Sequence, residues 1–410
     1  MKKFKKFFTI FLVVSCFAGI GFGNESVNSS IKSFNINGQT KTANVVTVDL
    51  NDQNLRFEVV KANDKITSSE PFKEMIARKN PIAAINANFF DAYKTLVPYG
   101  SIIRNGKIIY LEGKNASFSV LDNNAVHMDE YQIILKGYLD GNRQNYYDSK
   151  AKKMVFSLFN IWYVNNKPYD ATGAYLYTPE YGESIELNGG YVVVVKNDKV
   201  VEIINNPIVT VIPKDGYLIY YGSNCVFESY VRDRFSKGRS VEIECEVVED
   251  KESITKVSNY TNDKEEPKEN DKKAIKESEK KESEIDKSVF YLKDAKQLIS
   301  AGPLLIREGQ NVVNITKEGF KEDKIKNNPA QRSAIGITRD KKIVFVTISR
   351  TTVNDLALIM QQLNCAYAMN LDGGASSALY ANDKIITTPG RNLNTVLMVL
   401  KNESKAIEIN

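Results

Sequence analysis

The residues best suited to chemistry in this chain of 410 residues lie together near its C-terminal end. They form the run Asn370-Leu371-Asp372-Gly373-Gly374-Ala375-Ser376-Ser377, which follows an apolar segment. Because residues two apart on a strand share a face, the spacing predicts that Asn370 and Asp372 point to the same side. Glycines after a strand end allow positive φ, which lets successive backbone N–H groups converge on an anion. The run therefore predicts a site for a phosphorylated or sugar ligand, and the alternative is a tight turn between core strands.

Two further polar clusters stand at predicted strand ends. The segment from Asn86 to Asp91 ends an apolar run, and Arg332 precedes another. Asp91 and Asp372 would supply the two carboxylates that glycoside cleavage requires. Arg332 would supply a two-pronged donor that matches the geometry of a phosphate. The structural alternatives are a turn cap for Asp91 and a surface salt bridge for Arg332.

Composition excludes several other kinds of protein. The net charge of +5 is small against 55 basic and 50 acidic residues, which are interspersed, so nucleic acid is not a predicted partner. The single histidine, His127, rules out a His-rich metal site and makes a Ser-His-Asp triad improbable. Phosphate-binding loops of the GxxxxGK[ST] or strand-linked GxGxxG type are absent. Chemistry must therefore rest on carboxylates, arginine, amides and hydroxyls.

The N-terminal residues predict export. Four lysines precede an apolar run from Phe7 to Ile20, and small residues follow at Gly21 and Gly23. This pattern is typical of a secretory signal peptide, which we place at residues 1–23. The segment before Cys16 also resembles a lipobox, so lipid anchoring through Cys16 or an uncleaved helix is an alternative to secretion. We expect a secreted or cell-envelope protein whose contact with the membrane is limited to such an anchor.

The rest of the chain predicts a β-rich α+β fold with a few packed helices and mostly antiparallel or mixed sheet. Helices are expected at residues 71–79 and 353–364, the second capped by Thr352. Hairpins are expected around Asn105-Gly106, around Arg339-Asp340, and between residues 43–50 and 55–62. Residues 159–182 read as an aromatic loop, either stacking on a sugar or filling its own core. We expect one domain over residues 33–403, with the charged run 250–287 as a disordered insertion.

Five strings in the same order carry a family resemblance: INANFFD, PYGSIIRNGK, YTPEYG, RSAIG and NLDGGASS. With them the chain, from roughly residue 40 to residue 400, resembles the phosphodiester glycosidase family. The resemblance implies catalytic roles for Asp372, Asp91 and Arg332. The substrate-binding residues that it implies are Asn86, Asn370, Gly373, Gly374, Ser376 and Ser377. Departures from the family pattern are Ala87-Asn88 and Ala375, where relatives often have glycine.

These observations predict an exported hydrolase that cleaves the bond between the anomeric carbon of a sugar and a phosphodiester. The expected substrate is an N-acetylglucosamine-1-phosphate-like diester, an envelope polysaccharide or a teichoic acid. The alternative from another class is a non-catalytic envelope protein that binds phosphorylated glycans with the same pocket. No cofactor is predicted, although Asp91 and Asp372 could instead ligate a divalent cation. The sequence does not specify an oligomeric state.

Overall fold

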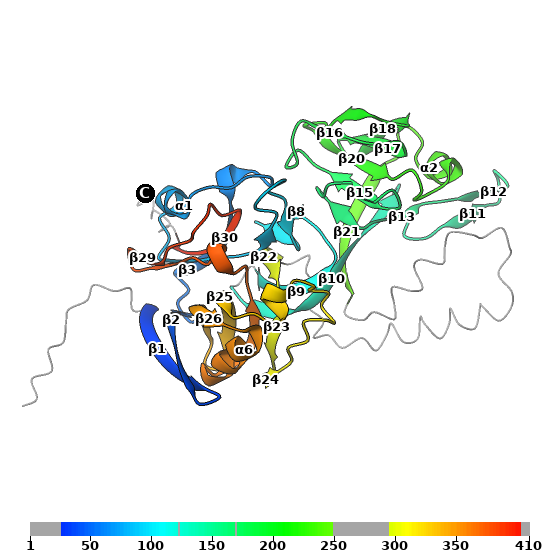
Figure 1. Ribbon diagram of the computed structural model, residues 1–410. Coiled ribbons are helices and arrows are strands. Elements are labelled where there is room, and N and C mark those ends of the chain that lie inside the picture. Colours follow the sequence, from blue (N-terminus) through cyan, green and yellow to red (C-terminus); the bar gives the residue numbers. More distant parts are fainter. Residues whose placement is uncertain (1–25, 122–123, 169, 249–294, 403–410) are drawn as a thin grey trace, which may run out of the picture.

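The computed structural model describes residues 26–121, 124–168, 170–248 and 295–402 (Figure 1). The predicted signal peptide, Cys16 and the charged run 250–287 lie outside the described residues. Within the described ranges, no helix combines the length and apolar character needed to cross a membrane. The domain limits at 33 and 403 stay a prediction.

The first sheet combines strands from the N-terminal and C-terminal parts of the chain, and all its neighbouring strands are antiparallel. Its strands, in spatial order, are β1 (Val27–Ile36), β2 (Gln39–Asp49), β26 (Lys342–Thr351), β25 (Ala330–Thr338), β27 (Cys365–Asn370), β23 (Leu304–Arg307) and β24 (Gln310–Asn311). The N-terminal hairpin thus pairs directly with strands near the C-terminus. Because β27 lies inside this sheet, the candidate residues that follow it are anchored to the core.

The second sheet packs on the inner face of the first. Its order is β29 (Lys384–Thr387), β28 (Leu379–Ala381), β4 (Ala83–Asn86), β30 (Thr395–Lys401) and β3 (Leu55–Lys61). Side chains from both inner faces, among them Val46, Phe345, Ile85 and Leu397, share one buried cluster. Alternation along each strand makes the two-sided burial possible, because neighbouring residues point to opposite faces.

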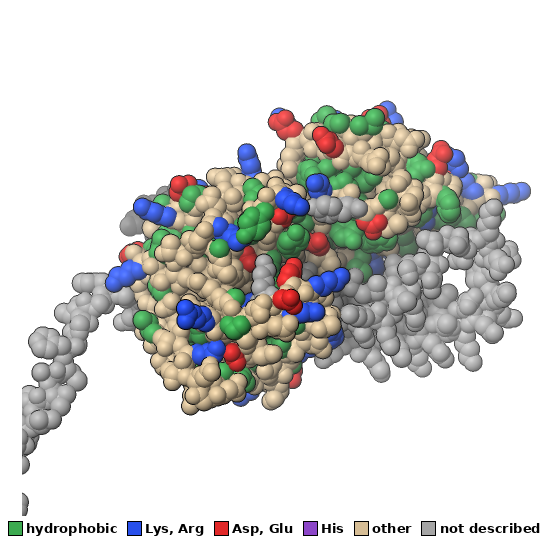
Figure 2. All heavy atoms as spheres, in the orientation of Figure 1, with side chains coloured by type: hydrophobic (Ala, Val, Ile, Leu, Met, Phe, Trp, Pro, Cys, Tyr) green, Lys and Arg blue, Asp and Glu red, His purple; other side chains and the backbone are tan. Residues whose placement is uncertain are grey.

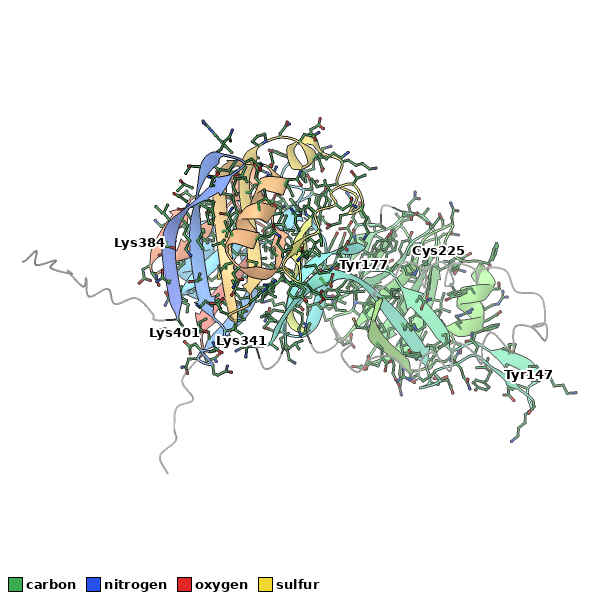
Figure 3. The ribbon with its side chains drawn as sticks, turned by 90° about the horizontal axis from the view of Figure 1, so that it is seen from below. Tyr147, Tyr177, Cys225, Lys341, Lys384 and Lys401 are labelled. Atoms are coloured by element: carbon green, nitrogen blue, oxygen red, sulfur yellow. The ribbon has the colours of Figure 1, made fainter. Side chains whose placement is uncertain are left out.

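Helices cover the outer faces of this sandwich. Helix α6 (Val353–Gln362) packs on the first sheet, and α1 (Phe72–Lys79) packs on the second. Figure 3 shows α6 lying across the strands of the first sheet. The cap on α6 is the predicted one, because Thr352 Oγ1 accepts the N–H of Asp355 at 3.1 Å. The remaining α-helices of the described part are α2 (Glu228–Arg234) and α5 (Asp323–Lys326), and two 3-10 helices are η1 (Ala62–Asp64) and η4 (Gly374–Ser376).

A third sheet links the sandwich to the aromatic-rich part of the chain. It contains β13 (Leu158–Ile161), β10 (Val126–Leu139), β9 (Lys114–Leu121), β22 (Ala295–Ala301), β7 (Ile102–Arg104) and β8 (Lys107–Tyr110), with β21 (Val241–Val248) on β10. The N-terminal half of β10 pairs with β9, and its C-terminal half pairs with β13 and β21. Strands β21 and β22 flank the charged run and belong to this same sheet.

The fourth sheet contains β14 (Tyr163–Val164), β15 (Ala174–Tyr177), β20 (Gly216–Tyr221), β17 (Tyr191–Lys196) and β18 (Lys199–Asn205). Three short pairs complete the fold: β5 (Phe89–Phe90) with β6 (Pro98–Tyr99), β11 (Tyr146–Asp148) with β12 (Lys153–Val155), and β16 (Ser184–Glu186) with β19 (Val209–Val211). Figure 3 shows Tyr147 on the projecting β11–β12 hairpin and Tyr177 inside the molecule. Figure 2 shows acidic and basic side chains interspersed on the visible face.

The predicted β-rich α+β class is confirmed, as are both predicted helices and the hairpins at Asn105-Gly106 and Arg339-Asp340. The hairpin predicted between residues 43–50 and 55–62 is wrong. Strand β2 pairs with β1 and β26, whereas β3 pairs with β30 in the other sheet. Residues 159–182 are also more regular than predicted, because β13, β14 and β15 run through them. Tyr175 and Tyr177 on β15 are buried, so these two rings fill the core.

The buried cluster between the first and second sheets predicts which substitutions lower the stability most. Phe345 on β26 has none of its surface exposed, and Phe345→Ala should lower the free energy of unfolding by about 3–5 kcal/mol. The matched control is Phe227→Ala, since 74% of Phe227 is exposed. Denaturant unfolding checks both variants. Equal losses for the two would contradict the packing described here.

Candidate active site

One cavity brings together segments that are far apart in the sequence. It has a volume of about 880 Å³. Its walls come from the β5–β6 region, from Glu112-Gly113, from the segment between Glu318 and Arg332, from residues 372–375 and from Arg391. Asp91, Arg332 and Asp372 all line it. Cavities of this size typically hold small-molecule ligands.

Asp372 stands on the cavity wall just after β27 ends. Its backbone N–H donates to the Ala87 carbonyl at 3.1 Å, and its own carbonyl accepts from Asn86 Nδ2 at 2.6 Å. Its carboxylate Oδ1 accepts the N–H of Gly373 at 2.9 Å. Asp372 is therefore fixed on both sides of its Cα, which suits a group that must be positioned accurately.

The side chain of Asn86 connects the Asp372 segment to neighbouring strands through hydrogen bonds. Its side chain is buried, and Oδ1 accepts from Ser333 Oγ at 2.8 Å and from the Ala378 N–H at 2.9 Å. With the bond from Nδ2 to the Asp372 carbonyl, both polar atoms of the Asn86 side chain are hydrogen-bonded within the protein. Asn86 was predicted to bind substrate, but it does not line the cavity. It acts on the site by positioning Asp372.

The two glycines of the loop are needed for different reasons. Gly374 has a φ of +61°, a conformation that favours glycine. Gly373 has an extended φ of −124°, but a Cβ there would lie 2.8 Å from the Gln331 carbonyl oxygen. Both line the cavity, and the Gly373 N–H is donated to Asp372. Ala375 is not among the residues with positive φ, so alanine fits at this departure from the family pattern.

Besides Asn86, three further residues predicted to bind substrate do not line the cavity. Asn370 is buried and its Nδ2 donates to the Gly302 carbonyl at 2.7 Å. Strand β27 ends at Asn370, and Asp372 beyond it lines the cavity, so the shared face of these two residues stays a prediction. Ser376 and Ser377 are also buried, and in the described part of the chain their hydroxyls have no hydrogen-bond partner.

Arg332 lies on β25 and presents a buried cation to the cavity. Only 4% of its surface is exposed, which excludes the surface salt bridge considered for it. Its Nε donates to the Thr351 carbonyl and its Nη2 to the Asn328 carbonyl, both at 3.0 Å. Burial lowers the pKa of Arg332, but a guanidinium stays protonated in proteins. The wall therefore carries a rigidly held positive charge.

Asp91 caps its own turn, as the structural alternative predicted, although it also lines the cavity. Its carboxylate accepts from the Thr95 N–H at 3.0 Å, from Thr95 Oγ1 at 2.9 Å, and from the N–H groups of Lys94 and Tyr93 at 3.2 and 3.3 Å. These bonds, the two from Thr95 above all, lower the pKa of Asp91. The carboxylate is thus ionised and its oxygens are already used.

Sequence reasoning missed two carboxyls on the same cavity, Glu318 and Glu112. Burial, reinforced by the charge of Glu130, raises the pKa of Glu318 to about 8. Burial also raises the pKa of Glu112, which accepts the Gly100 N–H at 3.3 Å. Neither residue stands in a chemically suggestive motif. Their pKa values depend on desolvation by residues distant in sequence, so no local signal could have identified them.

Aromatic rings form part of the wall beside these charges. Phe89 and Phe320 line the cavity with their ring centroids 5.8 Å apart, and Tyr99 is half exposed. Arg391 also lines it and donates to Tyr93 Oη at 2.9 Å. Such rings can pack against the C–H face of a sugar. Among the described residues, no group of three or more His, Cys, Asp and Glu side chains could hold a metal ion.

Comparison with known proteins identifies the family and shows related folds. Residues 182–400, more than half of the chain, match the family model of the phosphodiester glycosidases. A hypothetical protein from Synechocystis has a similar structure, with a TM-score of 0.69 and 20% identity over 92% of this chain and 62% of that one. The chain therefore spans less than two thirds of that protein.

A protein from Burkholderia pseudomallei has a TM-score of 0.59 and 16% identity over 88% of this chain and 74% of its own. The zebrafish N-acetylglucosamine-1-phosphodiester α-N-acetylglucosaminidase catalytic domain, auto-inhibited by its pro-peptide, has a TM-score of 0.44 and 12% identity. That match covers 92% of this chain and 83% of the zebrafish domain. At such identities the first two likenesses show a shared fold. None of the curated proteins matches the sequence.

The contacts of Asn86 predict that its side chain stabilises the loop from Asp372 to Ala378. Asn86→Ala leaves the Asp372 carbonyl, the Ser333 hydroxyl and the Ala378 N–H without their partner. Because an unpaired buried polar group costs about 1–3 kcal/mol, we expect the variant to lose about 3 kcal/mol or more in denaturant unfolding. Asn51→Ala is the control, since that exposed side chain bonds only within its own turn. Equal stability of Asn86→Ala and wild type would refute the positioning role.

The raised pKa of Glu318 predicts how stability changes with pH. Burial shifts it from 4.5 to about 8, so the folded protein binds a proton more tightly than the unfolded chain. The resulting stabilisation is complete below pH 4.5 and is lost as the pH rises towards about 8. Glu318→Gln should flatten this decline in unfolding experiments at pH 5 and pH 8, whereas Glu322→Gln should leave it in place. An unchanged slope in Glu318→Gln would disprove the assignment.

Proposed function

This chain belongs to the phosphodiester glycosidase family, and on that premise we propose that it hydrolyses the bond between a sugar anomeric carbon and a phosphodiester. The observation that carries the proposal is the meeting of Asp372 and Arg332 in one cavity. A carboxylate can act on the anomeric carbon, and a buried guanidinium can hold the phosphate. The aromatic rings of Phe89 and Phe320 supply a surface on which a sugar can pack.

The reaction breaks the bond between the anomeric carbon and the bridging oxygen, whose electron pair leaves with the phosphate. Water supplies the oxygen that replaces it, and the proton released is taken up by carboxylate or solvent. Because the departing phosphate is a weak base, the protein mainly stabilises positive charge on the sugar and holds the leaving anion. Arg332 holds the anion, together with the backbone around Gly374.

Asp372 is the carboxylate that acts on the sugar. Asp91 is the weaker candidate, because four hydrogen bonds from its own turn already occupy its oxygens. Direct attack by Asp372 retains the configuration of the released sugar, whereas activation of water inverts it. NMR of the first sugar released distinguishes these two routes.

We place the activity outside the cytoplasmic membrane, on a phosphate-linked glycan of the cell envelope such as a teichoic acid. The support is the N-terminal pattern of lysines followed by an apolar run. An anionic polymer with sugar-phosphate linkages fits a cavity that combines a guanidinium with aromatic rings.

Asp372→Asn tests the proposal. The substrate is the methyl phosphodiester of N-acetylglucosamine 1-phosphate, and released sugar is measured by chromatography. Asp372→Asn should lower kcat/KM by at least about a hundredfold, because the acting carboxylate is lost. Arg332→Lys should lower it about tenfold or more, since an ammonium cannot make the two-pronged contact. The control is Asp340→Asn, which removes an exposed carboxylate away from the cavity.

A second candidate function is binding without turnover, and the same assay separates it. If wild type binds the diester but releases no sugar, the enzyme proposal fails and the binding function stands. If Asp372→Asn is as active as wild type, the assignment of Asp372 is wrong although the activity itself survives.

A further inference from the structure

Glu318 is a carboxyl on the cavity wall that the proposed reaction has not yet used. It lies between β24 and α5, and its two oxygens accept the Leu304 N–H at 3.0 and 3.2 Å. Leu304 begins β23, where it stands opposite Met369 of β27. Asp372 follows the end of β27. Glu318 is therefore tied to the start of β23, beside the end of β27 that leads to Asp372, and both carboxyl residues line one cavity.

The packing around Glu318 is tight. A Cβ on Gly302 would lie 3.0 Å from Glu318 Oε2 and 3.2 Å from the Phe320 ring, so a side chain there would crowd the carboxyl. Within the described chain, Glu318 forms no ion pair with a basic side chain. The neighbouring cations have other partners: Arg307 pairs with Asp129 and with Glu130 at 3.1 Å, and Lys317 lies 4.0 Å from Glu130. Glu130 itself repels a negative charge on Glu318.

The charge balance of the cavity makes the protonation of Glu318 important for an anionic ligand. The titratable and charged side chains that line the cavity with Glu318 are Asp91, Tyr93, Tyr99, Glu112, Lys321, Glu322, Arg332, Asp372 and Arg391. Acidic groups outnumber basic ones, so an ionised Glu318 would add to the repulsion of a phosphodiester. A neutral carboxyl instead presents an O–H donor. Burial raises the pKa of Glu318 to about 8, so the neutral form dominates at pH 7.

We propose that Glu318 works as a neutral carboxyl whose O–H donates a hydrogen bond to a non-bridging oxygen of the phosphodiester. No proton is transferred, because the departing phosphate is stable as an anion. Glu318 thus complements Arg332: one group holds the phosphate by charge, and the other by a hydrogen bond in a desolvated position. This inference rests on the proposed function, since it assigns Glu318 to the same substrate.

The pH profiles of matched variants test it. Wild type, Glu318→Gln and Glu322→Gln are assayed with the methyl phosphodiester of N-acetylglucosamine 1-phosphate between pH 6 and pH 10. Wild-type kcat/KM should fall about tenfold for each pH unit above 8, as the donor is lost. Glu318→Gln should stay within a few-fold of wild type at pH 7 and should lack the decline, because its amide is a neutral donor at every pH. Glu322→Gln removes one exposed carboxyl from the same wall and should keep the decline.

Two results would overturn the inference. A decline in Glu318→Gln identical to that of wild type would assign it to another group. A loss of a hundredfold or more in Glu318→Gln at every pH, with normal thermal unfolding, would show that a proton is transferred after all.

Calorimetric binding separates this inference from the proposed function. If wild type releases no sugar, the proposed function fails, but binding of the same diester still reports on Glu318. Wild-type affinity should then fall roughly tenfold between pH 7 and pH 9, while the affinity of Glu318→Gln stays constant. Equal pH dependence of binding in the two proteins, or no binding at all, would refute the role of Glu318.

Discussion

The buried amide of Asn86 is the contact on which the site depends. It stands at the end of β4 in the second sheet, and it bonds Ser333 on β25 of the first sheet. It also bonds both sides of the segment that carries the chain from β27 to β28, that is, from one sheet to the other. A loop that crosses between two packed sheets must satisfy its backbone groups away from water. One asparagine satisfies two of them and thereby fixes Asp372.

The surroundings of two cavity carboxyls, Asp91 and Glu318, favour different protonation states. Asp91 sits in a solvated turn, where hydrogen bonds from its own backbone favour the charged form. Glu318 packs beside Gly302 and Phe320 with another carboxylate nearby, and this environment favours the neutral form. Pairs of acidic groups whose environments push their pKa values apart are common in enzymes that handle acids and bases at neutral pH. Here the difference comes from hydrogen bonds at Asp91 and from burial at Glu318, and not from residue type.

Local features of this fold could be predicted because they depend on neighbours in the sequence. Helix α6 follows from apolar spacing and a threonine cap, and the β7–β8 hairpin follows from Asn105-Gly106. The partner of β3 could not be predicted in the same way. Apolar and polar residues alternate in both 43–50 and 55–62. The sheet that each segment joins, however, depends on pairing with a strand some 300 residues later in the sequence. Alternation predicts a strand but does not name its partner.

For the candidate site, too, local features could be predicted from the sequence and contacts between distant residues could not. Residue types and spacing were enough to predict that Asp91, Arg332 and the run after Asn370 are suited to chemistry. The order of the five family strings was enough to predict the family. The folded chain was needed to show that Asp372 and Arg332 line one cavity and that Asp91 caps a turn. It was also needed to show that the buried amides of Asn86 and Asn370 donate to backbone carbonyls. Only the tertiary structure adds Glu318. The physical reason is that hydrogen-bond partners and desolvation come from residues brought together by folding, and a motif contains neither.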